Sequence, residues 1–233
     1  MEIKVAKFGG TSLADAVQIA KVKKIIEADP ARRYIVPSAP GKSDRYQIKV
    51  TDLLYGLESA IEQGEDYRPF YDKIFARFTD IKRDLGLSVN IEAQLEEILA
   101  NLLDGAGADY AASRGEYLNG MLIADYLGYA FVDAAEVILF DKRGKYDEKR
   151  TEKVLSERLR GLERAVIPGF YGSMPNGSIK TFSRGGSDVT GSIVARAVHA
   201  DIYENWTDVS GFLMADPRIV DNPKTIETIT YRE

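Results

Sequence analysis

Several segments of the sequence combine glycines with a charged side chain, a composition typical of loops that bind anions. In the first segment, residues 7–12, Lys7 stands two residues before the pair Gly9-Gly10. Glycines let the backbone approach a phosphate closely, and the N–H groups at the start of a following helix favour an anion. The same residues also suit an ordinary strand–turn–helix junction that is capped by Ser12. This segment alone leaves both interpretations open.

The second segment, residues 182–198, places Arg184 before two glycines, and Ser187 and Asp188 then open a predicted helix. An arginine can bind a carboxylate through two parallel hydrogen bonds. Ser and Asp at a helix start are common caps, but capping does not account for the arginine. The pattern therefore favours a binding site over a simple helix start.

The third segment, residues 205–220, contains Thr207-Asp208 after a predicted strand and Asp216-Pro217-Arg218 after a turn. Such side chains could hold a ribose, a phosphate or the edge of a base. Asp-Pro is also a common turn former, so a turn-rich connection explains the segment equally well.

Residues 36–43 imitate the end of a P-loop, because they finish with Gly41-Lys42-Ser43. The P-loop motif requires a glycine at the position of Val36. Pro37 and Pro40 also lack the backbone donors that such a loop uses. We therefore reject a P-loop here and expect a loop at the carboxyl end of a strand that lines a ligand crevice.

The composition narrows the possible chemistry. The 233 residues carry a net charge of −5, which argues against broad binding to nucleic acid or an anionic membrane. There is no cysteine and a single histidine, His199, so thiolate catalysis and Cys/His metal clusters are excluded. No apolar run is long enough for a membrane span. We expect a cytoplasmic protein without nucleic-acid or membrane partners.

The elements that must position these segments begin with a βαβ pattern. Residues 2–8 predict a strand, Gly9-Gly10 end it, and a helix is expected from about Leu13 to Ala28. Ser12 and Asp15 fit a capping box for this helix. Residues 33–43 then predict a strand that runs into a loop. This order implies a parallel sheet.

The rest of the chain divides into a helical stretch and a return to strands. Apolar residues at helical spacing predict helices through residues 47–127, with breaks near Gly64, Gly86 and Gly105. After this stretch we expect strands at 129–141, 165–168, 179–182 and 201–205, helices at about 151–160 and 187–200, and a strand-to-helix junction at 223–233.

Six motifs, taken together, resemble those of the aspartate kinases of the amino-acid kinase family. They occur in the same order as in that family and extend over essentially the whole chain. They are Lys-Phe-Gly-Gly-Thr-Ser at 7–12, Ser-x-Gly-Glu at 113–116, Gly-Phe-x-Gly-Ser at 169–173, Arg-Gly-Gly-Ser-Asp at 184–188, Thr-Asp-Val-x-Gly at 207–211 and Asp-Pro-Arg at 216–218.

The resemblance implies a three-layer α/β/α sandwich around a mainly parallel sheet. Residues 1–165 would bind aspartate and contain the helical insertion 47–127, and residues 166–233 would begin the nucleotide-binding part. The implied reaction is ATP-dependent phosphorylation of the L-aspartate side chain to 4-phospho-L-aspartate, the first step of lysine, threonine and methionine biosynthesis. Mg²⁺ would be held mainly by the nucleotide phosphates, and a homodimer is expected for the full-length protein.

The resemblance also assigns roles to single residues. Lys7 and Asp188 would be catalytic, with Lys7 stabilising the transferring phosphoryl group. Phosphate and nucleotide would be bound by Lys7, Gly9, Gly10, Thr207, Asp208 and Arg218. Aspartate would be bound by Ser38, Thr51, Glu116, Phe170, Arg184 and Ser187. No residue is assigned as a metal ligand.

The sequence departs from the family at Leu213, where relatives often carry tyrosine, and at its end. Family members continue through another nucleotide-binding segment and usually through regulatory ACT domains. We therefore expect a truncated chain that alone is weakly active or inactive and insensitive to lysine or threonine.

Two alternatives remain. The first is a related kinase that acts on acetylglutamate, glutamate or uridylate. Arg184 with Glu116 favours a free amino acid, because one pairs with a carboxylate and the other with an ammonium group that an acetylated amine lacks. The second is a non-catalytic binding or regulatory subunit of the same fold. The presence of both Lys7 and Asp188 argues against it.

Overall fold

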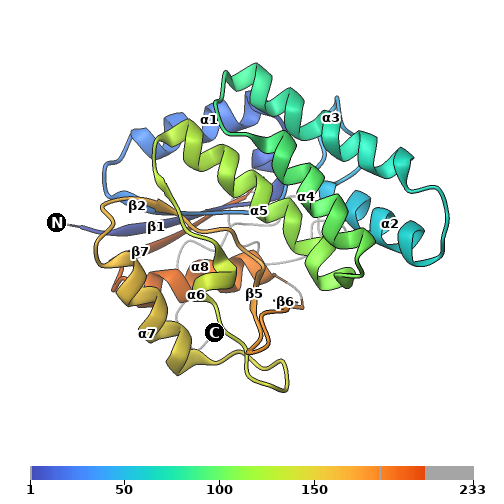
Figure 1. Cartoon of the computed structure of the whole chain (residues 1–233). Coiled ribbons are helices and arrows are strands. Elements are labelled where there is room, and N and C mark those ends of the chain that lie inside the picture. The colour runs from blue at the N-terminus through green and yellow to red at the C-terminus, as the bar shows by residue number, and fades with distance from the viewer. Residues whose placement is uncertain (1, 184, 208–233) are drawn as a thin grey trace, which may run out of the picture.

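A five-stranded parallel sheet forms the centre of the computed structural model, which describes residues 2–183 and 185–207 (Figure 1). Its strand order is β3-β4-β2-β1-β7, so the first strand of the chain lies between the second and the last. The sequence predicted a mainly parallel sheet, and this is confirmed. The strands are β1 (Lys4–Phe8), β2 (Arg32–Pro37), β3 (Ala130–Phe131), β4 (Ala165–Val166) and β7 (Ile202–Trp206).

Helices cover both faces of this sheet, which gives the three layers expected (Figure 1). One face carries the short 3₁₀ turn η1 (Gly10–Leu13) and the helices α1 (Ala16–Glu27), α2 (Val50–Glu62), α3 (Arg68–Leu85), α4 (Ile91–Leu103) and α5 (Gly107–Leu127). The other face carries α6 (Ala134–Val137), α7 (Glu148–Leu159) and α8 (Gly186–Ala197). A separate antiparallel hairpin consists of β5 (Tyr171–Ser173) and β6 (Ile179–Thr181).

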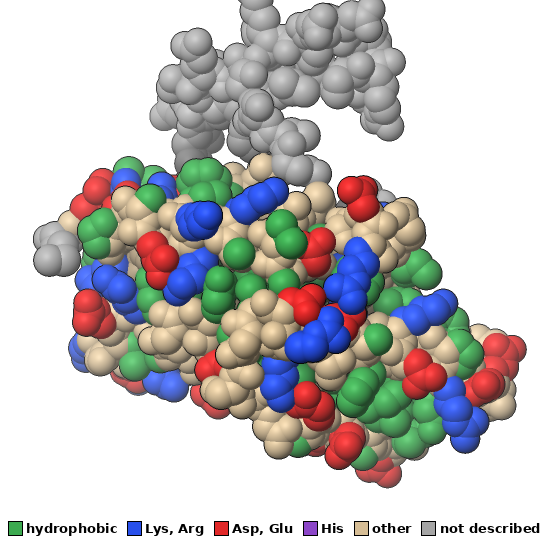
Figure 2. Space-filling model, turned by 90° about the horizontal axis from the view of Figure 1, so that it is seen from above, with side chains coloured by type: hydrophobic (Ala, Val, Ile, Leu, Met, Phe, Trp, Pro, Cys, Tyr) green, Lys and Arg blue, Asp and Glu red, His purple; other side chains and the backbone are tan. Residues whose placement is uncertain are grey.

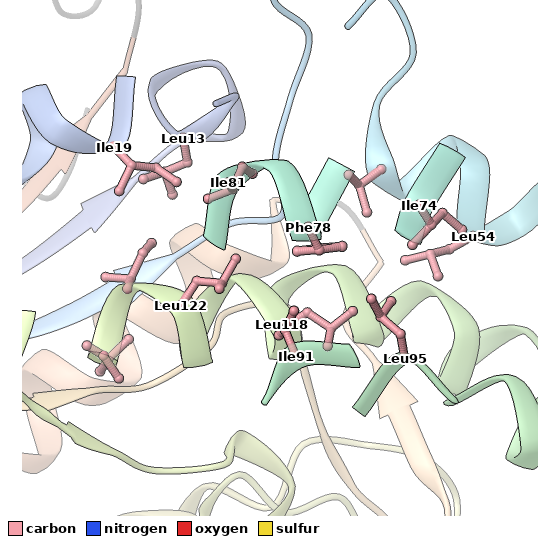
Figure 3. Packing of buried hydrophobic residues seen from close by; sticks show 14 of the residues in the cluster. Leu13, Ile19, Leu54, Ile74, Phe78, Ile81, Ile91, Leu95, Leu118 and Leu122 are labelled. Atoms are coloured by element: carbon pink, nitrogen blue, oxygen red, sulfur yellow. The ribbon is translucent and has the colours of Figure 1, made fainter. Parts of the chain in front are cut away.

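Two apolar cores follow from the alternation of side chains along the strands. Ala6 and Phe8 of β1 join the core under α1 to α5, whereas Val5 joins the core under α7 and α8. Figure 3 shows the first core, where Phe78 of α3 and Leu118 of α5 lie among leucines and isoleucines. On the outer side of these helices, basic and acidic side chains are interspersed rather than gathered by sign (Figure 2).

The predicted helical stretch is present as four helices, and α3 ends where the sequence placed a break. Gly86 adopts a left-handed conformation with φ 66°. Because glycine has no Cβ, this conformation causes no steric clash. Each of the four helices buries one face in a common core. The helices could therefore be predicted from the spacing of their apolar residues alone.

Two local expectations were wrong. Residues 129–141 form only the two-residue strand β3 before α6, because Asp133 caps that helix by accepting a hydrogen bond from the Ala135 amide at 2.9 Å. The cap of α1 is Asp15 itself, which accepts from the Gln18 amide at 3.0 Å. Ser12 lies in η1 instead of opening the helix. The junction predicted at 223–233 lies outside the described residues.

Within the described residues, no helix combines the length and apolar character needed to cross a membrane.

Candidate active site

The carboxyl ends of β1, β2 and β7 meet at one edge of the sheet. Lys7 pairs with Val36 of β2 on one side and with Asn205 of β7 on the other. The three segments that follow these strands are therefore neighbours: the glycine turn after β1, the loop after β2, and Thr207 after β7. This is the place where open α/β sheets bind ligands.

Lys7 forms an ion pair with Asp188, with 2.6 Å between Nζ and Oδ1. The lysine side chain is only 9% exposed, whereas that of Asp188 is 48% exposed. Asp188 lies in the first turn of α8, which begins after Gly185 in a left-handed conformation. Two motifs separated by about 180 positions thus form one charged pair.

The two glycines after β1 differ in their surroundings. A Cβ on Gly10 would lie 2.7 Å from the Ala39 carbonyl oxygen, so no other residue fits there without a shift of the backbone. A Cβ on Gly9 would make only ordinary contacts, 3.6 Å from the Trp206 carbonyl oxygen and 3.8 Å from Lys7 Nζ. Gly10 is therefore required by packing, and Gly9 leaves space open in front of the lysine.

This difference predicts opposite outcomes for two alanine substitutions. Gly10→Ala should lower the free energy of unfolding by about 1–3 kcal/mol, because it overpacks the contact with the Ala39 main chain. Gly9→Ala should stay within about 0.5 kcal/mol of the parent protein. Denaturant unfolding measures both values, and an equal loss for the two variants would contradict the assignment.

A small cavity of about 180 Å³ lies beside the glycine turn. Glu116 of α5 forms part of its wall and is only 6% exposed. The cavity is lined by Gly10, Thr11, Ser38, Ala39, Pro40, Gly41, Lys49, Thr51 and Glu116. The cavity thus brings together Ser38, Thr51 and Glu116. These residues come from three separate segments and were predicted to bind the same ligand.

Burial raises the pKa of Glu116 to about 8. The Ala39 main-chain N–H, a main-chain hydrogen bond within Glu116 and the charge of Arg114 act in the opposite direction but do not compensate. Glu116 Oε2 has no hydrogen-bond partner within the described part of the chain. A buried carboxyl group of this kind gains stability from a cationic ligand that enters the cavity.

The position of Glu116 depends on small and polar neighbours along α5. A Cβ on Gly115 would lie 2.8 Å from the Ala39 Cβ, so glycine lets the helix approach the loop after β2. One turn beyond Glu116, Asn119 donates from Nδ2 to the Ser38 carbonyl oxygen at 2.7 Å. Sequence reasoning missed Asn119, although its spacing of three from Glu116 places both on one helix face.

Phe170 and Ser187 lie next to the start of α8. Phe170 has φ 80°, which is rare for a residue other than glycine, and its N–H donates to Thr190 Oγ1 at 3.1 Å. Strain of this type is concentrated at functional sites. Gly169 lets the chain before Phe170 approach Ser187 closely, because a Cβ on Gly169 would lie 2.6 Å from Ser187 Oγ.

The other predicted residues are placed as follows. Thr207 directly follows Trp206, whose carbonyl oxygen accepts from the Gly9 N–H at 3.1 Å. Sequence reasoning did not single out Trp206 or Lys49, and it considered Gly41 only as part of the rejected P-loop. Arg184, Asp208 and Arg218 lie outside the described residues, so their roles stay predictions.

The chain belongs to the amino acid kinase family, whose model matches residues 2–233. Among curated relatives, aspartokinase 3 of Bacillus subtilis (strain 168) is 38% identical over 99% of this chain, and lysine-sensitive aspartokinase 3 of Escherichia coli (strain K12) is 30% identical over 100%. These matches cover 54% and 55% of the relatives, so the chain spans about half the length of each.

Solved structures agree with the sequence relatives. Clostridium acetobutylicum aspartate kinase is 55% identical with a TM-score of 0.94, over 100% of this chain and 54% of its own. E. coli aspartokinase III in complex with aspartate and ADP is 29% identical with a TM-score of 0.81, over 97% of this chain and 53% of its own. The predicted fold class is therefore confirmed, as is the resemblance to aspartate kinases.

Proposed function

We propose that the protein is an aspartate kinase, which transfers the γ-phosphoryl group of ATP to the side-chain carboxylate of L-aspartate. The product is 4-phospho-L-aspartate. The observation that carries this proposal is the Lys7–Asp188 pair beside a small cavity with a buried carboxyl group. The similarity to an enzyme solved with aspartate and ADP supports the same substrates.

At the amino-acid end, we infer that ionised Glu116 accepts hydrogen bonds from the ammonium group of aspartate. Ser38 and Thr51 supply hydroxyl groups to the same cavity. Ser187 in the first turn of α8 and Phe170 before β5 remain our candidates for contacts with the same ligand, and Arg184 remains our candidate for the α-carboxylate. A cavity of about 180 Å³ suits a molecule of this size.

At the phosphate end, the Lys7 ammonium stabilises negative charge on the phosphoryl group during transfer. Asp188 holds the Lys7 ammonium group in place, and the open space at Gly9 lets the main chain approach the phosphate. The acceptor is a carboxylate that is already ionised at neutral pH, so no strong general base is needed. Positioning and charge stabilisation carry most of the catalysis in such a transfer.

Mg²⁺ would be held at this site mainly by the nucleotide phosphates. The described part of the chain contains no group of three or more acidic or His side chains that could hold a metal ion, and Asp188 is occupied by Lys7. Mg²⁺ often binds through one or two protein carboxylates and substrate phosphates, and when bound it would neutralise phosphate charge. Thr207, Asp208 and Arg218 remain our candidates for the nucleotide side.

We further propose that residues 1–165 form the aspartate-binding part, that residues 166–233 begin the nucleotide-binding part, and that the full-length protein is a cytoplasmic homodimer. The reaction would open lysine, threonine and methionine biosynthesis.

A hydroxamate assay on the full-length protein with ATP and Mg²⁺ tests the proposed activity. Aspartate should give product, whereas glutamate and acetylglutamate should give at least tenfold less. UMP, tested by ADP release, should give none. Preference for acetylglutamate would assign the site to another kinase of this fold, because an acetylated amine has no charge for Glu116. Tight binding without turnover would favour a regulatory subunit.

A further inference from the structure

A buried arginine lies behind the glycine turn and has no role in the chemistry above. Arg77 of α3 is 1% exposed and is among the largest fully buried side chains in the described part of the chain. It forms no ion pair with any carboxylate of residues 2–183 or 185–207. Burial lowers its pKa to about 10, so it stays charged at neutral pH.

The guanidinium group of Arg77 is fixed by the loop between β2 and α2. Its Nη2 donates to the Gly41 carbonyl oxygen. Its centre lies 3.9 Å from the centroid of the Tyr46 ring, and the Tyr46 hydroxyl donates to Asp80 at 2.7 Å. Asp80 lies one turn beyond Arg77 on α3, and Arg45 of the loop also pairs with Asp80 and Asp84, so the helix holds this loop through several side chains.

The same loop is joined to the glycine turn and to the cavity. The Gly41 N–H donates to the Gly10 carbonyl oxygen at 2.8 Å. The two glycines are in such close contact that a Cβ on Gly41 would lie 2.6 Å from the Gly10 carbonyl carbon. Gly10 and Gly41 both line the cavity that contains Glu116. Arg77 therefore binds the carbonyl group of the same residue, Gly41, whose N–H binds the glycine turn.

We propose that Arg77 is a positioning residue for phosphoryl transfer, which holds Gly41 against Gly10 and so fixes the distance between the phosphate turn and the aspartate cavity. This inference rests on the proposed function. Phosphoryl transfer depends on the spacing of donor and acceptor, and a misplacement of about 1 Å can lower a rate about 100-fold. Arg77 contacts neither reactant and acts through the Gly41 main chain.

A purely structural role explains the arginine less well. An apolar side chain of similar volume often packs as stably as a buried charge. Yet here a charged group is buried and leaves its Nε without a partner in the described part of the chain. What the guanidinium adds over such a side chain is a directed hydrogen bond to one particular carbonyl group.

The test compares Arg77→Met and Arg77→Lys with the parent in the full-length protein. Arg77→Met should lower kcat 10- to 100-fold and leave KM for aspartate and ATP within about threefold. Arg77→Lys keeps the positive charge and can still donate a hydrogen bond, so its kcat should lie between that of the parent protein and that of Arg77→Met. Ile74→Val, a core change on the same helix, is the control; it should lower the melting temperature without changing kcat.

Amide hydrogen exchange gives a readout that does not depend on turnover. Exchange at Gly41 and in residues 10–13 should rise in Arg77→Met and not in Ile74→Val. Unchanged kcat and unchanged exchange in Arg77→Met would overturn the proposal. If Arg77→Met does not fold, a wild-type kcat in Arg77→Lys would overturn it. If the parent phosphorylates no aspartate, the proposed function fails, and the exchange data still decide whether Arg77 holds the loop.

Discussion

Replacing Lys7 with methionine should lower kcat for aspartate phosphorylation about 100- to 1000-fold. The substitution removes the ammonium group that we propose stabilises the transferring phosphoryl group. KM for aspartate should change less than about threefold, since Lys7 lies at the phosphate end of the site. Steady-state kinetics on the full-length protein, together with aspartate binding by calorimetry, measure both effects.

The control for this variant is Lys4→Met, on the same strand. Lys4 lies toward the other end of β1, where it pairs with Asp29 at 2.8 Å, so its loss should leave kcat unchanged. Asp188→Asn should reproduce much of the loss in kcat, because the lysine ammonium would no longer be held in place. A Lys7→Met protein that keeps its rate would show that the catalytic assignment is wrong.

The second large effect is expected for Glu116→Gln, which should weaken aspartate binding about 10- to 100-fold. A charge-assisted hydrogen bond to a buried group contributes about 1.5–3 kcal/mol. Gln keeps the shape of the side chain but cannot balance the ammonium charge. The matched control is Glu92→Gln on the outer surface of α4, whose partner is Lys82, and it should leave aspartate binding unchanged.

The raised pKa of Glu116 gives this prediction a distinctive signature. Below about pH 8 the empty cavity holds a protonated carboxyl group, and aspartate binding must ionise it. Binding near pH 6.5 should therefore release about one proton, measured by calorimetry in buffers of different ionisation enthalpy. Aspartate affinity should rise with pH up to about 8. Proton release that persists in Glu116→Gln would contradict this account.

The same shift affects stability with a defined sign. The pKa in the folded state, about 8, lies above the ordinary value of 4.5, so the folded protein holds a proton that the unfolded chain loses. The contribution of Glu116 to stability is therefore largest below about pH 4.5 and falls as the pH rises to about 8. Glu116→Gln should be the more stable protein above pH 8.

Part of the site could be predicted from the sequence, because the loops that form it begin at the carboxyl ends of predicted strands. The strand that contains Lys7 and the helix that begins at Gly186 carry local signals, and parallel pairing brings the end of the strand and the start of the helix to one edge of the sheet. The contact between Lys7 and Asp188 then follows from topology. Topology did not place Ser38 and Glu116 in one site; only the resemblance to the aspartate kinases did, because no local pattern shows how the helices between them are arranged in space.

The residues that were missed act through tertiary contacts that no local pattern encodes. Gly41 was read only as a failed P-loop glycine, whereas its function in the fold is to pack against Gly10. Asn119 and Arg77 each reach a main-chain carbonyl of the loop after β2 from another helix. The expected strand at 129–141 failed for a local reason, because the cap at Asp133 outweighed the β-branched residues that follow.

The place of β1 in the sheet has a consequence for how the protein is made. β1 precedes the other strands of this sheet in the sequence, and β7, its neighbour on one side, is the last of them. The Ile3 N–H donates a hydrogen bond to the side chain of Asp201, directly before β7, across 198 positions. Contacts of such separation form slowly, since a long loop must close before they contribute. During translation the early strands and the helical layer can assemble, but Lys7 gains its partner Asp188 only when α8 has left the ribosome.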